Sequence, residues 1–364
     1  PFLVPAMRAA EHLSLAEAGT VVAAPSAGLM LTLIAWGAAA DRYGERIVMV
    51  LGLGGAGLLL LLTSAAGVSP VGLFVLLALA GAAGASVNSA SGRVVMGWFA
   101  AHERGVAMGV RQTAQPFGVG LAALVLPRLA EHVDFRRTLL FPALLCLVVT
   151  VLVALFVVDP PRNPASQAAA GRSPYHHAAL WRLHGASTLL VVPQFAITAF
   201  ALEYLVRQHD WSPGAAGAFL AVVALAGVAG RLGSGYWSDR AASRLRPMRL
   251  LAVASAAVML LIALGDATWG WLAVAAIAIG SVVTVADNGL GFTSAAELAG
   301  ASWAGRALGA QNTAQQVAAL LTPPLLGMVI SGSGYTVAFA AVTVFPLLAV
   351  GLTPVAAEHA AAEY

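Results

Sequence analysis

Long runs of apolar residues alternate with short charged segments along the whole chain. One run without charged residues, 47–92, is 46 residues long (92 − 47 + 1) and holds a turn-forming segment, 63–70, near its middle. A helix of roughly 20 apolar residues crosses a bilayer core, so this run predicts two spans joined by a turn. The whole pattern predicts eleven spanning helices and the outer end of a first helix whose beginning is absent, within 1–10, 18–40, 47–62, 71–99, 105–129, 138–158, 180–206, 213–237, 250–265, 269–298, 305–331 and 335–354.

The composition supports a membrane protein built only from helices. The chain is 60% hydrophobic and 10% charged, whereas a soluble domain is about 25% charged. The single cysteine, Cys146, cannot form an intramolecular disulfide. No P-loop and no metal-ligand spacing of Cys and His occurs, so neither a cofactor nor a metal is expected. The basic residues do not cluster with aromatic residues, which argues against a nucleic-acid partner.

The second half of the chain repeats the first. Asn88 and Asn288 are 200 positions apart, and the same spacing relates Gly105 to Gly305, Thr113 to Thr313 and Gln115 to Gln315. A proline-containing segment lies between the halves. The repeat predicts two pseudo-symmetric six-helix bundles, an N-terminal one at 1–158 and a C-terminal one at 179–364, joined by a linker at 159–178.

A charged segment between the second and third predicted helices also occurs twice. The first copy is Gly37-Ala38-Ala39-Ala40-Asp41-Arg42-Tyr43-Gly44-Glu45-Arg46, and the second is Gly235-Tyr236-Trp237-Ser238-Asp239-Arg240. We call these two segments the hinges. Two copies at equivalent places resemble the loop signature of the major facilitator superfamily, the secondary transporters. This resemblance covers the whole chain and implies the superfamily's 12-helix transporter fold, with a monomer in the lipid bilayer.

The resemblance implies that the hinges control opening of one side of the protein. Gly37 would let a neighbouring helix approach, and Asp41 would then lie at the N-terminus of the helix at 305–331, beside Arg306. By symmetry, Asp239 would face the helix start beside Arg104. Carried over in the same way, the hinge residues with a gating role are Gly37, Asp41, Arg42, Gly44, Arg46, Gly235, Asp239 and Arg240. The alternative is that their arginines only fix membrane orientation.

The arginines also predict how the chain lies in the membrane. Eleven lie in or beside loops on the side of the linker, at Arg42, Arg46, Arg104, Arg162, Arg172, Arg182, Arg240, Arg244, Arg246, Arg249 and Arg306. Five lie on the opposite side, at Arg8, Arg128, Arg136, Arg137 and Arg207. Because positive residues stay in the cytoplasm, the linker and both native termini are expected to be cytoplasmic in the inner membrane.

Ionisable and amide side chains inside the spans are the candidates for a solute site, because burying them in lipid is costly. Arg111 and Gln115 share a helix face, and a buried cation needs an anion. The candidate solute-binding residues are Arg111, Gln115, Gln311, Gln315, Asn88, Asn288 and Arg93, although helix packing and snorkelling are alternatives for the amides and for Arg93. Asp287 and Glu203 are the candidates for carrying a proton, and Asp287 is the better placed.

These residues predict a secondary active transporter of a small polar solute, preferably an organic anion, with the proton as a candidate coupling ion. The segment 98–109 resembles the corresponding connection in organic-anion and sugar-phosphate permeases. The first alternative is a drug or metabolite exporter working by proton antiport, but Leu77 and Gln115-Pro116 depart from the marks of that branch. A polytopic membrane enzyme and a sensor that no longer transports are further alternatives. No clustered nucleophile and base support an enzyme.

Overall fold

Serine caps and prolines explain where several of the long helices begin. A computed structural model describes residues 1–99, 104–160, 173–241, 243–300 and 303–361; a few side chains within these ranges, including those of Asp41 and Arg104, lie outside the description. Ser14, Ser69 and Ser212 each accept a backbone N–H from the first turn of the helix that follows. Pro70 and Pro213 occupy the first helical position, where no N–H is needed.

The first half of the described chain consists of α1 to α6, and the second of α7 to α14. Their bounds are α1 Val4–Glu11, α2 Leu15–Tyr43, α3 Glu45–Ala65, α4 Pro70–Trp98, α5 Arg104–His132, α6 Leu140–Phe156, α7 Ala178–Gln208, α8 Pro213–Arg240, α9 Leu245–Ala267, α10 Gly270–Ala286, α11 Asn288–Ala299, α12 Ala304–Val342, α13 Val344–Leu352 and α14 Val355–Ala361, with short 3-10 turns at Arg137–Leu139 and Pro174–His176. Within these ranges every regular element is helical.

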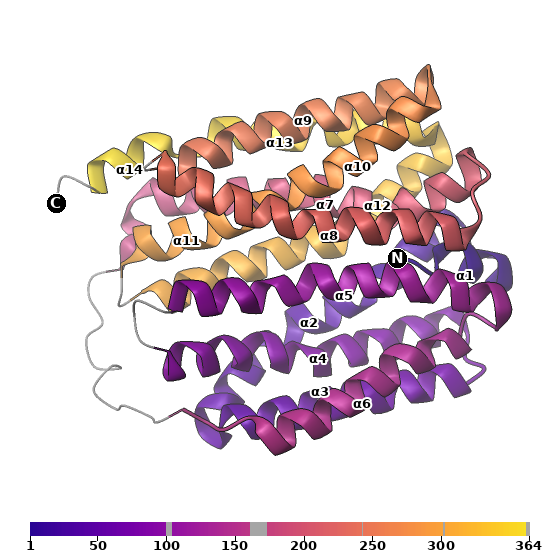
Figure 1. The fold of residues 1–364 in the computed structure, drawn as a ribbon, viewed down its shortest axis with the longest axis horizontal. Helices are drawn as coiled ribbons and strands as arrows, with labels where there is room; N and C mark the ends of the chain where they lie inside the picture. The colour runs from indigo at the N-terminus through magenta and orange to yellow at the C-terminus, as the bar shows by residue number, and fades with distance from the viewer. Residues whose placement is uncertain (100–103, 161–172, 242, 301–302, 362–364) are drawn as a thin grey trace.

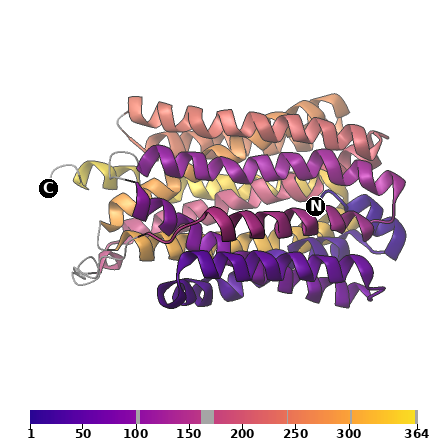
Figure 2. The same ribbon diagram turned by 60° about the horizontal axis from the view of Figure 1, so that its bottom comes forward.

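The helices form two bundles that lie side by side, as Figures 1 and 2 show. In the first half α4 packs against α2 and α3, and α6 packs against α3; in the second, α7 packs against α12 and α13, and α10 against α8 and α9. The main contacts between the halves are α2 with α12 and α5 with α8. In the sequence repeat α8 is equivalent to α2 and α12 to α5, so these two contacts are equivalent as well.

Three helix boundaries differ from the sequence prediction for identifiable reasons. The helix predicted at 269–298 is interrupted at Asp287, between α10 and α11. The helices predicted at 305–331 and 335–354 are separated at Gly334, whose φ of 80° suits glycine and is not helical, although the label α12 runs across it; the second of them is interrupted again at Thr343, between α12 and α13. The helix predicted to begin at 250 begins at Leu245, where the Glu358 carboxylate accepts the backbone N–H of Leu245 at 2.9 Å.

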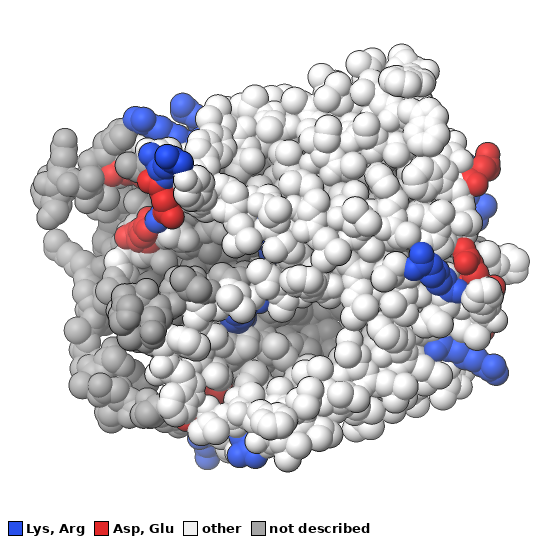
Figure 3. All heavy atoms as spheres, in the orientation of Figure 1, with Lys and Arg blue, Asp and Glu red and all other residues white. Residues whose placement is uncertain are grey.

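The surface has the distribution expected of a protein that crosses a bilayer. Nine stretches of the described chain are helical, long and apolar enough to span a membrane; α5 is not one of them, and one stretch covers both α12 and α13. Large apolar side chains such as Leu31, Ile34 and Phe156 are exposed, as lipid requires. Figure 3 shows charged side chains gathered at the two ends of the molecule, with a wide uncharged band between them.

We call the two ends the linker end and the far end. The linker end, on the left of Figure 1, holds the turn between α2 and α3, the two hinges and the chain around the linker. The far end holds the starts of α2, α4 and α8 and the end of α5. These names make no assumption about which end faces the cytoplasm.

Candidate solute-binding cavity

A cavity of about 200 Å³ lies between the two halves. It is formed by α5 from the first half and by α7, α8 and α10 from the second, so a movement of one half against the other would reshape it. Phe2 also contributes. The lining residues are Phe2, Gln115, Pro116, Val119, Gln194, Phe195, Ile197, Thr198, Ala201, Leu220, Ala224, Gly227, Arg231, Ser281, Thr284 and Val285.

The polar groups of this cavity come from both halves. Both terminal guanidinium nitrogens of Arg231, on α8, lie 3.4 Å from Gln115 Oε1, on α5. Gln194 Oε1, on α7, accepts a hydrogen bond of 3.1 Å from Asn288 Nδ2 at the start of α11. No Asp or Glu is among the described residues that line the cavity. The lining therefore carries a positive charge without a carboxylate of its own.

Asp287 lies behind this lining, at the interruption between α10 and α11. Its side chain is buried, with an exposed fraction of 3%, and it interacts electrostatically with Arg231. Ser234 of α8 donates a 2.6 Å hydrogen bond to the Ala286 carbonyl, which ties α8 to the same interruption. The acid predicted to carry a proton is thus placed beside the cation that lines the cavity.

Arg111 lies on α5 one turn closer to the linker end than Gln115. Its Nε donates a 2.9 Å hydrogen bond to Ser91 Oγ of α4, and it is not part of the cavity lining. In the part of the chain that the structure describes, Arg111 forms no ion pair: Glu203 pairs with Arg8 and Arg207, and Glu297 with Arg244.

The other predicted solute-binding residues lie outside the lining. Gln311 is fully buried, and its Oε1 is 2.9 Å from His184 Nδ1. Gln315 is also buried, and its amide nitrogen has no partner among the described residues. Asn88 is exposed on α4, and Asn288 reaches the cavity only through Gln194.

Arg93 belongs to the first hinge rather than to the cavity. Its guanidinium donates a 3.2 Å hydrogen bond to the Gly37 carbonyl, and its Nε lies 3.6 Å from Glu45 Oε1. Arg93 thus contacts the end of α2 and the start of α3, and its predicted contact with a solute stays a prediction.

In each half, an acid that follows the last spanning helix caps the start of the helix after the hinge. Asp159 Oδ1 accepts the backbone N–H of Arg46 at 2.7 Å, and its other oxygen lies 2.2 Å from the position that a Cβ on Gly44 would occupy. Glu358 of α14 accepts backbone N–H groups of Arg244 and Leu245, at 2.5 Å and 2.9 Å. Both carboxylates cap a helix N-terminus, where an anion is favourable.

The close packing expected at the hinges is not formed in this structure. No described heavy atom lies within 4 Å of the place where a Cβ would be added at Gly37, Gly235 or Gly309. Asp239 forms an ion pair with Arg244 of its own loop, so the expected contact with the start of α5 is not seen. Arg42, Arg240 and Arg306 lie over neighbouring aromatic rings. The side chains of Asp41 and Arg104 lie outside the described part of the chain.

The far end, in contrast, is closed by direct contact between the halves. A Cβ added at Gly217 of α8 would lie 2.2 Å from the Ala123 carbonyl oxygen of α5, and one at Gly19 of α2 would lie 2.5 Å from the Pro323 carbonyl oxygen of α12. Backbones approach this closely only where a glycine lacks a side chain.

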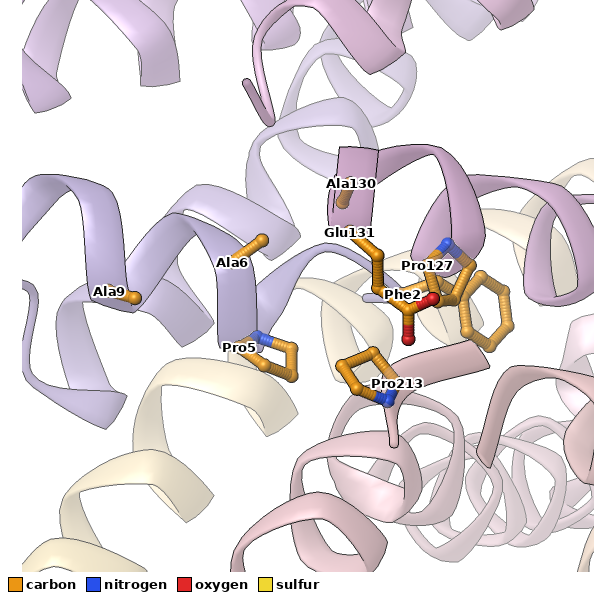
Figure 4. A pocket seen from close by; sticks show the side chains of 8 residues that line it. All are labelled: Phe2, Pro5, Ala6, Ala9, Pro127, Ala130, Glu131 and Pro213. Carbon is orange, nitrogen blue, oxygen red and sulfur yellow. The ribbon is translucent and has the colours of Figure 1, made fainter. Parts of the chain in front are cut away.

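Two acids add polar contacts across the far end. Glu131 Oε1 accepts the Gly214 N–H at 2.7 Å, and Figure 4 shows its carboxylate reaching from α5 toward the start of α8 at Pro213, beside a far-end pocket of about 240 Å³. Glu203 of α7, predicted as a second proton carrier, is fully buried and pairs with Arg8 of α1. Both contacts join the first half to the second.

Sequence reasoning did not select Arg231 or Gln194 as site residues. An arginine inside an apolar span was the available signal, and the repeat offered another for the hinges, since Asp159 and Glu358 are 199 positions apart (358 − 159).

The fold and the cavity define a class of protein: a membrane-spanning helical protein with two equivalent halves and a polar cavity between them. The sequence profile of the Major Facilitator Superfamily matches residues 1–323, and the chain belongs to this family of transporters, which are not enzymes. An uncharacterized MFS-type transporter of Mycobacterium tuberculosis is 43% identical over 363 residues, which covers 97% of this chain and 80% of that protein. The glycerol-3-phosphate transporter of Bacillus subtilis is 25% identical over 197 residues, covering 47% of this chain and 44% of that protein.

Solved structures share the fold at low sequence identity. A bacterial homologue of the human lysosomal transporter Spinster, in an inward-facing and unoccupied conformation, has a TM-score of 0.82 at 14% identity and covers 100% of this chain and 93% of that one. A D-xylose–proton symporter has a TM-score of 0.73 at 17% identity, covering 94% and 91%. These likenesses support the 12-helix transporter fold predicted from the two hinges.

Proposed function

We propose that the chain is a secondary active transporter that moves a small organic anion across the cytoplasmic membrane by alternating access. The observation that carries the proposal is the cavity between the halves, which presents Arg231 and two amides and has no carboxylate among its described lining residues. A cation inside a span is costly unless it is neutralised. Asp287 neutralises Arg231 while it is ionised, and an anionic solute would take over that role when Asp287 carries a proton.

Arg111 has a place in the same proposal. It lies on α5 between the cavity and the linker end, and no described acid neutralises it. The arginine distribution puts the linker end in the cytoplasm. The cavity would then exchange solute with the cytoplasm in the state seen here, because the far end is closed and no described atom packs on Gly37 or Gly235.

Asp287 is the proposed proton carrier. It is buried next to Arg231, so its carboxylate and a bound anion would compete for the same guanidinium. A proton on Asp287 removes that competition and favours binding of the anion, and a bound anion favours the protonated form of Asp287. One structural neighbour is described as a proton symporter, which supports this mode of coupling. Symport follows if both ligands move in the same alternating step.

Purified protein in liposomes that contain a pH-sensitive dye tests the proposal. Adding members of an organic-anion panel outside should acidify the interior for at least one anion, and neutral analogues of the same size should not. Asp287→Asn should abolish accumulation driven by a pH gradient but keep exchange of bound solute. Accumulation by Asp287→Asn would remove this residue from coupling, and transport only of cations or neutral solutes would contradict the proposed function.

A further inference from the structure

The polar and apolar parts of the cavity are separated along its length. Chain direction places Gln115, Gln194 and Arg231 on the side of the linker end, because α5 and α7 begin at that end and α8 finishes there. Farther toward the far end, Val119 on α5, Ile197 and Ala201 on α7 and Leu220 on α8 are apolar. The hydroxyl residues Thr198 on α7 and Ser281 on α10 also lie on this side, and each donates its hydroxyl to a carbonyl of its own helix.

The length of this gradient follows from α8. Leu220, Ala224, Gly227 and Arg231 line the cavity from one helix face. The first and last are eleven residues apart (231 − 220), which is about 16 Å along a helix. A charged head group at Arg231 would therefore leave room for an apolar body that extends toward Leu220.

The two glutamines at the linker side each keep an amide donor. Gln115 Oε1 faces Arg231, and Gln194 Oε1 accepts from Asn288, so the amide nitrogens of both glutamines remain to donate. The hydroxyls of Thr198, Ser281 and Thr284 donate to carbonyls of their own helices, at 2.8, 2.8 and 2.7 Å. A planar carboxylate matches a guanidinium flanked by amide donors.

The volume limits the size of the solute. About 200 Å³ is below the roughly 300–1,000 Å³ of sites for drug-sized ligands and corresponds to about seven liquid waters. A polyhydroxylated solute would leave its hydroxyls without partners against the apolar wall, which is unfavourable. A short hydrocarbon body has no such groups.

We propose that the cavity binds an amphipathic monocarboxylate, with its carboxylate on Arg231 between the amides of Gln115 and Gln194, and its hydrocarbon body along Val119, Ile197 and Leu220. This inference rests on the proposed function and narrows its substrate class. It makes Arg231 the residue that selects for charge and the far side of the cavity the part that selects for chain length.

Binding of a homologous series to purified protein, measured by calorimetry, tests the inference. The probes are acetate, butyrate, hexanoate and octanoate, with hexanamide as the neutral analogue and glycerol 3-phosphate as a hydrophilic anion. Each added CH₂ should tighten binding roughly threefold to fourfold until the cavity is full. Hexanamide and glycerol 3-phosphate should bind far more weakly than hexanoate.

Variants separate the two halves of the inference. Arg231→Gln should weaken hexanoate binding roughly ten- to hundredfold and remove the preference for hexanoate over hexanamide. Arg231→Lys, which keeps the charge, should recover part of the hexanoate affinity. Arg249→Gln, which removes an exposed arginine of α9, is the matched control and should bind as the unaltered protein does. Val119→Thr keeps the volume of the cavity wall but makes it polar, so it should weaken the binding of hexanoate more than that of acetate. This test does not depend on whether the Arg231 variants fold.

Equal binding of hexanoate to Arg231→Gln and to the unaltered protein would overturn the inference. So would affinity that does not rise with chain length, or tighter binding of glycerol 3-phosphate than of any monocarboxylate. That last result would leave the proposed transport of an organic anion intact, whereas failure of every anion in the liposome assay would reject both.

Discussion

At the far end α5 packs on α8 and α2 on α12 with glycine-to-backbone contacts, whereas at the linker end Gly37 and Gly235, the first glycine of each hinge, have no described neighbour where a side chain would begin. The same two pairs of helices are involved at both ends. The difference shows that the halves lean together at one end and apart at the other. In an alternating mechanism the contacts at the linker end would form only when those at the far end break.

Substituting the glycines at the two ends should have the largest and most clearly opposite effects. Gly217→Leu places a side chain where the Ala123 carbonyl now lies, so the far end cannot close and transport should be lost. At Gly235 an added side chain meets open space in this state. Gly235→Leu should therefore leave the present conformation intact and prevent closure of the linker end. Cysteine-accessibility labelling checks this. The same accessibility pattern in both variants would contradict opposite roles for the two ends.

Neutralising the hinge acids should have a smaller effect confined to the linker end. Asp41→Asn should slow transport roughly threefold to thirtyfold, because it removes an anion proposed to face a helix N-terminus in the closed linker end. Solute binding should change little. Asp239→Asn should act more weakly, since Asp239 already pairs with Arg244 in its own loop. Stopped-flow transport beside equilibrium binding measures both; equal losses of binding and rate would place Asp41 in the site instead.

Removing the charge of Glu131 should loosen the far end slightly. Glu131→Gln keeps an acceptor for the Gly214 N–H but loses the charge at the start of α8, and such exposed contacts are worth about 0.3–1 kcal/mol. The population with an open far end should rise roughly twofold to fivefold, measured by labelling of a cysteine at Ala215. Asp134→Asn, a neutralisation in the next loop, is the control. A shift of the same size in the control would show a general charge effect.

Removing the two carboxylates that cap the helices after the hinges should have the smallest effect on the protein. The loss of stability should be nearly equal in the two halves. Asp159→Ala and Glu358→Ala each remove an acceptor from a helix N-terminus and should cost about 0.5–2 kcal/mol of stability. Thermal unfolding in detergent measures this. A loss in only one half would show that the two hinges are not equivalent.

The fold could be predicted from the sequence because few backbone structures can cross a lipid bilayer. Long uncharged runs must become helices, and the 200-residue repeat relates the halves, so the two bundles and the hinge positions could be predicted. The interruption at Asp287 could not, because nothing in the apolar pattern around 270–299 requires a break there. The break at Gly334, in contrast, falls between the helices predicted at 305–331 and 335–354.

The site was harder to predict than the fold because the rotation of each helix decides which residues face the cavity. Arg111 and Gln115 share a face of α5, yet only Gln115 reaches the lining, since Arg111 turns to Ser91 of α4. Gln311, at the position equivalent to Arg111 in the repeat, bonds to His184 inside its own half. The contact of Arg231 with Gln115 depends on how closely α5 approaches α8, which the sequence pattern does not show.

Spin-label distances at both ends test the central claim, that the ends open in alternation. With Cys146 replaced by alanine, one pair of labels goes at His132 and Ala215 of the far end and another at Ala38 and Ala310 of the linker end, all exposed positions. The unaltered protein should show a short far-end distance and a long linker-end distance, and Gly217→Leu should reverse both. Far-end and linker-end distances that lengthen together, or that do not respond to Gly217→Leu, would contradict the account.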